Sequence, residues 1–336
     1  MRALVDIQPA EPGRDADALA IPPGVGRFTR HRFRPDAGPL LHGLPHLHLQ
    51  CWPGGNPAGR VLLLTHGTGY CGATLEPVAL RLQGLAREVW SFDRRGHGLS
   101  GRTPGDYGFL AFTRDLIALA DARGWRDIDV VAHSAGSTDV LLAAALRPDI
   151  FRRIVSIEPT VSDPGAPIDP APGAEPSPDG LAFGRALVES AGRRRARFAD
   201  RAAAHARFST RPPFDVVLPD ALDLYLNWGF RRAGDELILA CEPATEADIL
   251  GPIACAMGGI DSGDPAGDPF RLLTSQAVPV MVARTARSHP VFQEMAAIAA
   301  RHMPGTRGFV TLDSAHLAPM EAPDQVADLA RSFLYA

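Results

Sequence analysis

Ser134 has the sequence context of a nucleophile. It stands in Ala132-His133-Ser134-Ala135-Gly136, after the apolar run 127–131 and before the Ala/Leu-rich stretch 138–146, which predicts a helix. A serine flanked by small residues between a strand and a helix is the G-x-S-x-G elbow pattern, here with alanine in place of the first glycine. Such a sharp turn lifts the hydroxyl above the sheet edge and aims the first N–H groups of the helix at the reacting atom.

Two other segments carry residues that could complete such chemistry. His66-Gly67-Thr68-Gly69-Tyr70 follows the continuous apolar run 60–65, and a glycine turn there lets backbone N–H groups approach a ligand oxygen. The alternative interpretation is an ordinary tight turn from strand to helix. His316 follows the last predicted strand, 308–312, and is therefore placed where a base at the end of a strand would lie.

The elements that must position these residues alternate along the chain. Apolar runs predict strands and amphipathic stretches predict helices at intervals typical of βαβ units. This order predicts an α/β fold with a mostly parallel central sheet flanked by helices and right-handed crossovers. The predicted core strands are 60–65, 88–92, 127–131, 151–157, 278–283 and 308–312, and the predicted helices are 73–86, 109–124, 138–146, 290–301 and a last one ending near 335.

The pattern divides the chain into three parts. Residues 1–25, rich in Pro, Gly and Asp, predict a flexible N-terminal arm. Residues 26–160 and 271–336 form the predicted core, beginning with a hairpin, and 161–270 predict a mainly helical cap. The cap enters where one core strand ends, so we expect it to cover the edge at which open α/β sheets bind ligands. Its run Arg193-Arg194-Arg195 is typical of a solvated helix face.

Four segments, in this order and spacing, resemble the α/β-hydrolase superfamily, and specifically a serine hydrolase with a helical cap. The resemblance covers about residues 26–336. It implies Ser134 as the nucleophile, His316 as the general base, and backbone N–H groups of Ala135 and of the turn Gly67, Thr68, Gly69 as the oxyanion hole. The segments are His66-Gly67-Thr68-Gly69, Asp93-Arg94-Arg95-Gly96-His97-Gly98, Ala132-His133-Ser134-Ala135-Gly136, and Ala315-His316 followed by Pro319-Met320-Glu321-Ala322-Pro323.

The acid that should orient His316 departs from the common pattern of that superfamily. Most members place an Asp after the strand that is 278–283 here, but residues 284–289 contain no carboxylate. Glu158, at the end of the preceding core strand, is the predicted acid. Esterases and lactonases of this superfamily, including those acting on the macrolactone zearalenone, look similar at this strand end. Asp313 is the alternative acid, and Glu158 could instead only cap the entry to the cap.

The resemblance implies a cofactor-free enzyme that cleaves carboxylic esters through an acyl-enzyme, with a lactone or a small hydrophobic ester as substrate. A serine nucleophile argues against haloalkane dehalogenases and epoxide hydrolases, which use Asp. Neither G-x-G-x-x-G nor a P-loop is present, so no cofactor is predicted. The alternatives are carbon–carbon bond hydrolysis, hydroxynitrile cleavage by a lyase, cofactor-free oxygenation, and ligand binding without turnover.

Residues near the elbow and in the cap are the candidates for substrate binding. The aromatic cap residues could equally form the core of the cap. The candidates are Tyr70, His133, Tyr225, Trp228 and Phe230.

Composition restricts the binding partners and the cellular location that we expect. A net charge of −4 argues against nucleic acid or an anionic membrane as partner. The four cysteines show no C-x-x-C spacing, so we expect free thiols. The chain lacks an apolar leader and any run of 18 apolar residues, which predicts a cytoplasmic protein, compatible with a homodimer. His46 and His48 share one strand face, but no third ligand is evident, so no metal site is predicted.

Overall fold

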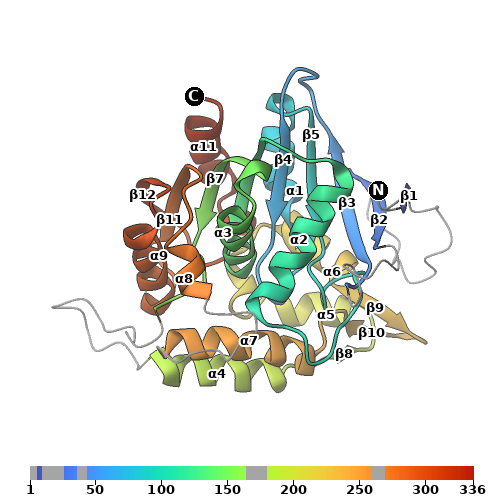
Figure 1. Cartoon of the computed structure of the whole chain (residues 1–336). Coiled ribbons are helices and arrows are strands. Elements are labelled where there is room, and N and C mark those ends of the chain that lie inside the picture. The colour runs from blue at the N-terminus through green and yellow to red at the C-terminus, as the bar shows by residue number, and fades with distance from the viewer. Residues whose placement is uncertain (1–5, 10–25, 36–43, 164–179, 259–268) are drawn as a thin grey trace.

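A nine-stranded sheet forms the centre of the computed structural model, which describes residues 6–9, 26–35, 44–163, 180–258 and 269–336. The strand order is β1-β2-β3-β5-β4-β6-β7-β11-β12 (Figure 1). The strands are β1 Asp6–Pro9, β2 Thr29–Arg34, β3 Leu47–Pro53, β4 Val61–Thr65, β5 Glu88–Phe92, β6 Ile128–His133, β7 Phe151–Ile157, β11 Val280–Thr285 and β12 Thr306–Leu312.

The predicted α/β class with a mostly parallel sheet is confirmed. From β5 to β12 every neighbouring pair is parallel, whereas β1, β2, β3 and β5 pair antiparallel. The predicted hairpin corresponds to β2 and β3. β1 corrects the prediction of a loose arm, because Asp6–Pro9 pairs with β2. A four-residue strand is too short to show a period in the sequence. The remainder of 1–25 lies outside the described residues.

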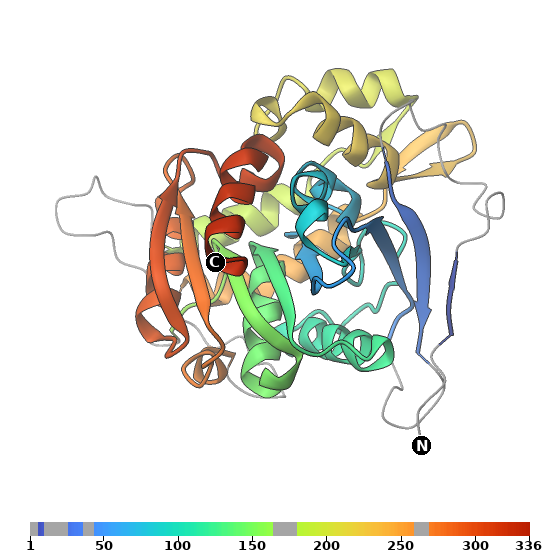
Figure 2. The ribbon, with the colours of Figure 1, turned by 90° about the horizontal axis from the view of Figure 1, so that it is seen from above.

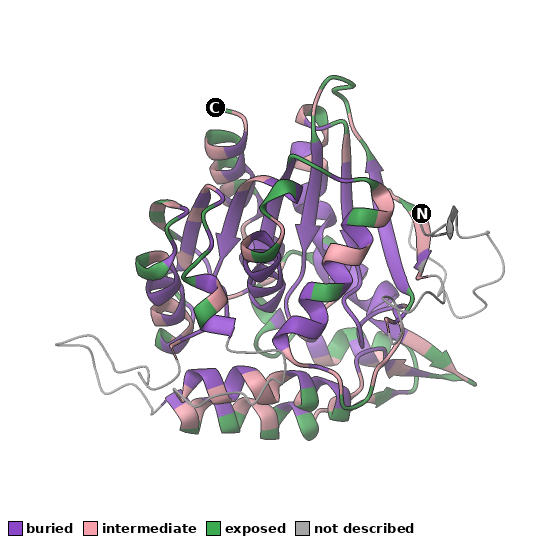
Figure 3. Cartoon of the chain, viewed as in Figure 1, coloured by how far each residue is buried: buried purple, intermediate pink, exposed green. Residues whose placement is uncertain are grey.

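Helices cover both faces of the sheet (Figure 2). Leu63 and Val130 face α2 Phe109–Arg123 and α3 Ala135–Leu146, while Leu62 and Val131 face α1 Glu76–Leu82 and α11 Pro323–Leu334. Burial on both faces, visible as purple strands in Figure 3, explains the continuous apolar runs of the central strands. The other helices outside the cap are α8 Pro269–Leu273, α9 Pro290–His302, α10 Ala318–Glu321, η1 Gly72–Leu75, η2 Gln83–Leu85 and η3 Pro148–Ile150.

Register brings the carboxyl ends of the central strands to one edge. Thr65 lies beside Ala132, and His133 lies beside Ile157, which in turn lies beside Ala283. Residues that directly follow β4, β6, β7 and β11 therefore emerge next to one another. This edge positions the site described below.

The cap is inserted between β7 and β11 and lies beneath this edge of the sheet in Figure 1. Its helices α4 Gly180–Gly192 and α7 Pro243–Met257 pack side by side. Gly184 permits their close approach, since an added Cβ there would lie 2.7 Å from Ala254 Cα. The remaining helices of the cap are α5 Arg201–Phe208, α6 Pro219–Trp228 and the short η4 Phe214–Val216.

The described part of the cap is mainly helical, as predicted, and it also contains a small antiparallel sheet that the sequence did not indicate. Its strands are β8 Arg197–Phe198, β10 Glu236–Leu239 and β9 Phe230–Ala233, in that order. Segments 164–179 and 259–268, which flank the cap, lie outside the described residues. Across the residues that are described, no helix combines the length and apolarity needed to cross a membrane.

Candidate active site

Ser134 sits in the strained turn that its sequence context predicts. It joins β6 to α3 with φ 54° and ψ −130°, a conformation that L-residues rarely adopt. The residues around Ser134 are small because larger side chains would clash with the turn. A Cβ on Gly136 would lie 2.4 Å from the carbonyl oxygen of His66, and one on Gly67 would lie 2.9 Å from Ser134 Cβ. Larger residues at either glycine would displace the turn.

Three side chains from three strand ends form one hydrogen-bonded chain. Ser134 Oγ lies 3.1 Å from Nε2 of His316, which follows β12. Nδ1 of His316 lies 2.6 Å from Oε2 of Glu158, which follows β7. The Phe292 ring stacks on the His316 imidazole, with centroids 4.2 Å apart and planes 19° apart. The Nε2–H of His133 donates to the His316 backbone carbonyl at 2.7 Å. The imidazole is thereby held at both nitrogens and on one face.

Glu158 is fully buried and its carboxylate is surrounded by donors. Oε1 accepts hydrogen bonds from the Thr285 N–H and the Thr285 hydroxyl, both at 2.9 Å, and from the Ser288 hydroxyl. Burial alone would raise the pKa of Glu158, but the hydrogen bond and charge of His316 together with these donors hold that pKa below its usual value. Glu158 is therefore a carboxylate at neutral pH.

Asp313 occupies a different place from Glu158. Its side chain is 80% exposed and pairs with Arg287 on the surface. Of the two carboxylates that the sequence left open, the structure brings Glu158 to His316 and leaves Asp313 in solvent.

The glycine turn after β4 lies against Ser134. One of the oxyanion-hole donors predicted from this turn is wrong. The Gly69 N–H donates to His97 Nε2 at 3.0 Å, so it is not free to meet a substrate oxygen. Ala135 is the first residue of α3, and its N–H has no acceptor within the helix. Thr68 lines the cavity over Ser134, and its hydroxyl is buried without a hydrogen-bond partner among the described residues.

Two buried, neutral histidines fix this turn. His66 donates from Nδ1 to the Gly67 carbonyl at 2.7 Å, and its Nε2 accepts the Arg94 N–H at 3.0 Å. His97 donates from Nδ1 to the Arg95 carbonyl at 2.9 Å while accepting from Gly69. Burial lowers the pKa of His66 to about 4 and that of His97 well below its usual value. Protonating either ring would remove an acceptor on which the turn depends.

A cavity of about 780 Å³ opens between Ser134 and the cap. Core and cap both contribute to its wall, which mixes apolar and charged side chains. Its lining includes Thr68, Tyr70, Ser134, Phe183, Leu187, Arg194, Arg195, Arg207, Phe208, Arg211, Asp215, Val216, Glu246, Leu250, Met257, Arg287, Ser288, Phe292 and His316.

Only Tyr70 of the predicted substrate-binding residues lines this cavity. Tyr225, Trp228 and Phe230 are at most 2% exposed and belong to the interior of the cap and its junction with the core. His133 lies behind the His316 backbone, where burial and the nearby His316 lower its pKa to about 3. These four assignments are corrected: apolar packing, and for His133 a hydrogen bond to the backbone, remove the side chains from the cavity.

The expectation that Arg193 to Arg195 form a solvated face holds only in part. Arg193 is exposed, but Arg194 and Arg195 line the cavity. Arg194 bonds to the Glu246 carboxylate at 2.6 Å and lies 3.3 Å from the Tyr225 hydroxyl. The fold of the cap, which turns the chain after α4, brings Arg194 partly inward, while Arg195 lines the cavity and stays exposed.

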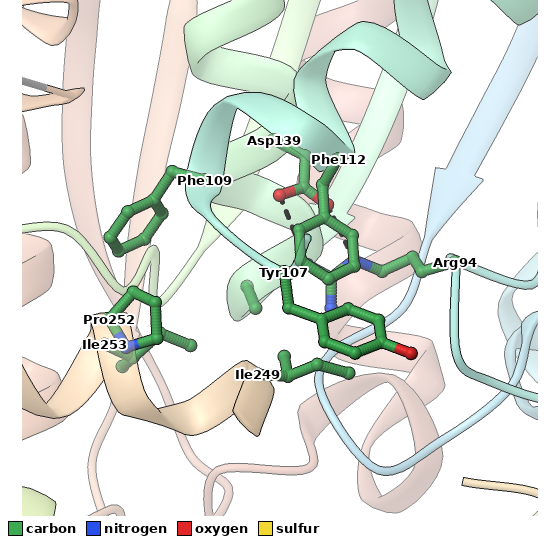
Figure 4. Close-up of a pocket in the computed structure, with 9 residues that line it drawn as sticks. Arg94, Tyr107, Phe109, Phe112, Asp139, Ile249, Pro252 and Ile253 are labelled. Atoms are coloured by element: carbon green, nitrogen blue, oxygen red, sulfur yellow. Dashed lines mark hydrogen bonds and ion pairs between the residues drawn. The ribbon is translucent and has the colours of Figure 1, made fainter. Parts of the chain in front are cut away.

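A buried ion pair anchors the helix that begins at the nucleophile (Figure 4). Arg94, on the loop after β5, bonds to Asp139 of α3 at 2.6 and 3.2 Å, and the Phe112 ring lies 4.1 Å from its guanidinium carbon. Burial raises the pKa of Asp139 to about 6, against the opposing charge of Arg94. Ile249 and Ile253 of α7 face the same small cavity, so the cap packs directly beside this anchor.

No set of three or more metal-ligating side chains occurs among the described residues. His48 is buried, with Nδ1 3.0 Å from Asp93 Oδ2, and His46 bonds to the Leu99 carbonyl. All four cysteines are free thiols, as expected.

The sequence did not indicate several residues around the triad. Thr285 and Ser288 hold Glu158, and Phe292 stacks on His316. The strand end that lacks an acid carries two hydroxyls instead. Placing the acid at Glu158 could have identified them, since a carboxylate on a neighbouring strand end needs donors beside it.

Comparison with known proteins identifies the family to which the chain belongs. The model described as "Alpha/beta hydrolase family" matches residues 61–329. The chain is 31% identical over 101 residues to 2-(acetamidomethylene)succinate hydrolase of Mesorhizobium japonicum, covering 30% of this chain and 36% of that protein. It is 34% identical over 133 residues to monoglyceride lipase of Mus musculus, covering 35% of this chain and 43% of the lipase. Each alignment therefore spans less than half of the relative.

A solved structure agrees over a longer stretch. The crystal structure of E-2-(acetamidomethylene)succinate hydrolase superposes with a TM-score of 0.67 at 23% identity, covering 88% of this chain and 97% of that one. At this identity the likeness concerns the fold.

Proposed function

The chain belongs to the α/β-hydrolase family, and from that premise we propose that it is a cofactor-free serine hydrolase that cleaves carboxylic ester bonds. The hydrogen-bonded chain Ser134–His316–Glu158 carries the proposal. A serine hydroxyl is a poor nucleophile until an adjacent imidazole accepts its proton. A buried carboxylate on the other ring nitrogen fixes the tautomer and balances the imidazolium charge.

The reaction would proceed through an acyl-enzyme. His316 Nε2 takes the Ser134 proton as Oγ attacks the substrate carbonyl. The resulting oxyanion accepts hydrogen bonds from the Ala135 N–H and from the turn at Gly67 and Thr68, each donor contributing about 3 kcal/mol. His316 then protonates the leaving alcohol, and a water activated by the same imidazole releases the acid.

The enclosed cavity favours a small or medium-sized ester, including a lactone. A volume of about 780 Å³ accommodates a compact substrate held over Ser134. In a lactone the acyl and alcohol parts stay joined, so the product is one hydroxy acid.

Hydrolysis of a carbon–nitrogen bond is the second candidate. One similar protein is named for an acetamidomethylene compound, whereas another is named a lipase. The same triad serves both reactions, because His316 can protonate a leaving nitrogen as well as a leaving alkoxide.

A substrate panel with trapping of the nucleophile tests the proposal. Wild type and Ser134→Ala are assayed on p-nitrophenyl esters, aliphatic and aromatic lactones, N-acyl amides and β-diketones. A fluorophosphonate is then mapped by mass spectrometry. We expect ester turnover that falls about 10³-fold or more in Ser134→Ala and a single adduct on Ser134. An adduct elsewhere, or turnover of β-diketones alone, would overturn the proposal.

A further inference from the structure

We propose that the cavity selects a substrate that carries a carboxylate, bound by cap arginines while its ester lies at Ser134. This inference rests on the proposed function and narrows it, because it replaces a neutral hydrophobic ester with an anionic one. The observation behind it is an excess of positive charge on the wall that faces the nucleophile.

The segment 193–211 contains seven arginines and a single acidic residue, Asp200. Four of these arginines pair with carboxylates of the cap. The four pairs are Arg193 with Glu189, Arg194 with Glu246, Arg197 with Glu236, and Arg201 with Asp223.

The other three arginines all line the cavity. Arg195 donates to the Arg197 carbonyl and lies over the Phe198 ring, and it has no carboxylate partner among the residues that the structure describes. Arg207 and Arg211 have no side-chain partner within the described part of the chain. The three arginines of this segment that have no counter-ion among the described residues thus all line the cavity that also contains Ser134.

The remaining charges of the wall do not cancel this excess. Five arginines line the cavity, but Arg194 is paired with Glu246, and Arg287 is paired with Asp313 and Glu321. Three arginines of the wall therefore remain against one carboxylate, Asp215. The whole chain carries a net charge of −4, so the sign at the cavity is opposite to that of the molecule. A positively charged cleft of this kind attracts anions and raises their local concentration.

Guanidinium groups fit a carboxylate because their planar fork can donate two parallel hydrogen bonds. A phosphate ester would meet the same donors. The wall favours a carboxylate on a short carbon chain, because apolar side chains such as Phe183, Leu187 and Phe208 lie among the arginines. We therefore expect a carboxylate and an ester or lactone carbonyl in one substrate.

The test compares two esters that differ only in charge, 4-nitrophenyl hydrogen glutarate and its methyl ester. We expect kcat/KM to be about tenfold higher for the anionic ester, and added salt to reduce that ratio. The double variant Arg207→Gln/Arg211→Gln should lower the ratio by about tenfold. The matched control is Arg197→Gln, because Arg197 is paired with Glu236 and does not line the cavity. It should keep the wild-type ratio.

A binding experiment separates this inference from the proposed function. Glutarate and inorganic phosphate are titrated by calorimetry into Ser134→Ala, with and without the two arginine substitutions. Glutarate should bind more tightly than phosphate and lose affinity in the triple variant. Phosphate binding more tightly, or equal turnover of both esters by wild type, would overturn the inference and leave the proposed function standing. Glutarate binding without turnover of either ester would overturn the proposed function alone.

Discussion

At the scale of single residues, the acid Glu158 is held by hydrogen-bond donors at the end of β11, a strand end that has no carboxylate of its own. Glu158 has φ 46°, which turns its side chain out of β7 toward the end of β11. There Thr285 and Ser288 donate to Oε1, and Oε2 remains for His316. A glutamate that merely capped the entry to the cap would not need this set of donors.

Removing one donor tests this arrangement. Ser288→Ala should lower kcat about tenfold on any ester substrate, because a hydrogen bond to an ionised group contributes roughly 1.5–3 kcal/mol. Its loss also raises the pKa of Glu158, so the defect should grow toward acidic pH. Ser275→Ala is the control, since that exposed hydroxyl only donates to the Leu272 carbonyl. A Ser288→Ala enzyme with wild-type kcat throughout would contradict the role given to this donor.

At this scale the sequence predicts residues that directly follow strands, but not residues that reach the site from another element. The places of Ser134, His316 and Glu158 after apolar runs predict them as site residues, and in the structure they lie in one hydrogen-bonded chain. Phe292 belongs to helix α9 and meets His316 only in the folded chain. Contacts of this kind depend on how a helix is oriented in the fold, and the hydrophobic periodicity of the sequence does not report that orientation.

At the scale of elements, continuous apolar runs located the buried strands. The predicted limits 88–92 and 151–157 are those of β5 and β7. The strands that were missed, β1 and β8 to β10, have two to four residues each. Strands of that length exist through pairing with a distant partner, as β8 does with β10 some 40 residues later, and carry no period of their own.

The turn after β4 gives the fold a dependence on pH. The folded-state pKa of His66 is depressed to about 4, so the stabilisation from the neutral ring is complete above about pH 6.5 and is lost as pH falls toward 4. We expect the free energy of unfolding to drop over this interval, by an amount on the order of 3 kcal/mol for His66 alone. Urea denaturation at successive pH values measures it.

Two variants compare the effect of substituting a buried histidine with that of substituting an exposed one. His66→Asn should unfold more readily at pH 7 and show a flatter dependence between pH 6.5 and 4, because the titrating group is gone. His205→Gln, at an exposed position on α5, should keep the wild-type slope. A wild-type stability that stays constant down to pH 4.5 would contradict the neutral, buried state of these rings.

At the scale of the whole molecule, the cap and the core form the cavity jointly, and the interior of the cap is aromatic. Composition alone could not separate aromatic residues that pack inside the cap from those that face the substrate. Trp228 illustrates the difference, since its ring packs against Phe28 with centroids 5.1 Å apart and lies near His48 of β3. It joins the cap to the sheet and does not reach the cavity.

Substitutions in the cap should therefore divide into two groups. Trp228→Ala should destabilise the protein by about 3–5 kcal/mol, with KM in the folded fraction little changed. Val216→Ser, at a cavity-lining residue that is 45% exposed, should leave stability within about 0.5 kcal/mol. Chemical denaturation and steady-state kinetics on the same samples measure both. A several-fold change in KM for Trp228→Ala at unchanged stability would return Trp228 to the site.

The proposed activity depends on three residues that lie 24 and 158 positions apart in the chain and meet at one edge of the sheet. The most direct test is kcat for Glu158→Gln beside Asp313→Asn, with circular dichroism to verify that both fold. We predict that Glu158→Gln loses about 10²–10⁴-fold, because the amide stabilises the wrong tautomer of His316, while Asp313→Asn retains most activity. The reverse order, or a Glu158→Gln enzyme as active as wild type, would contradict the proposed triad.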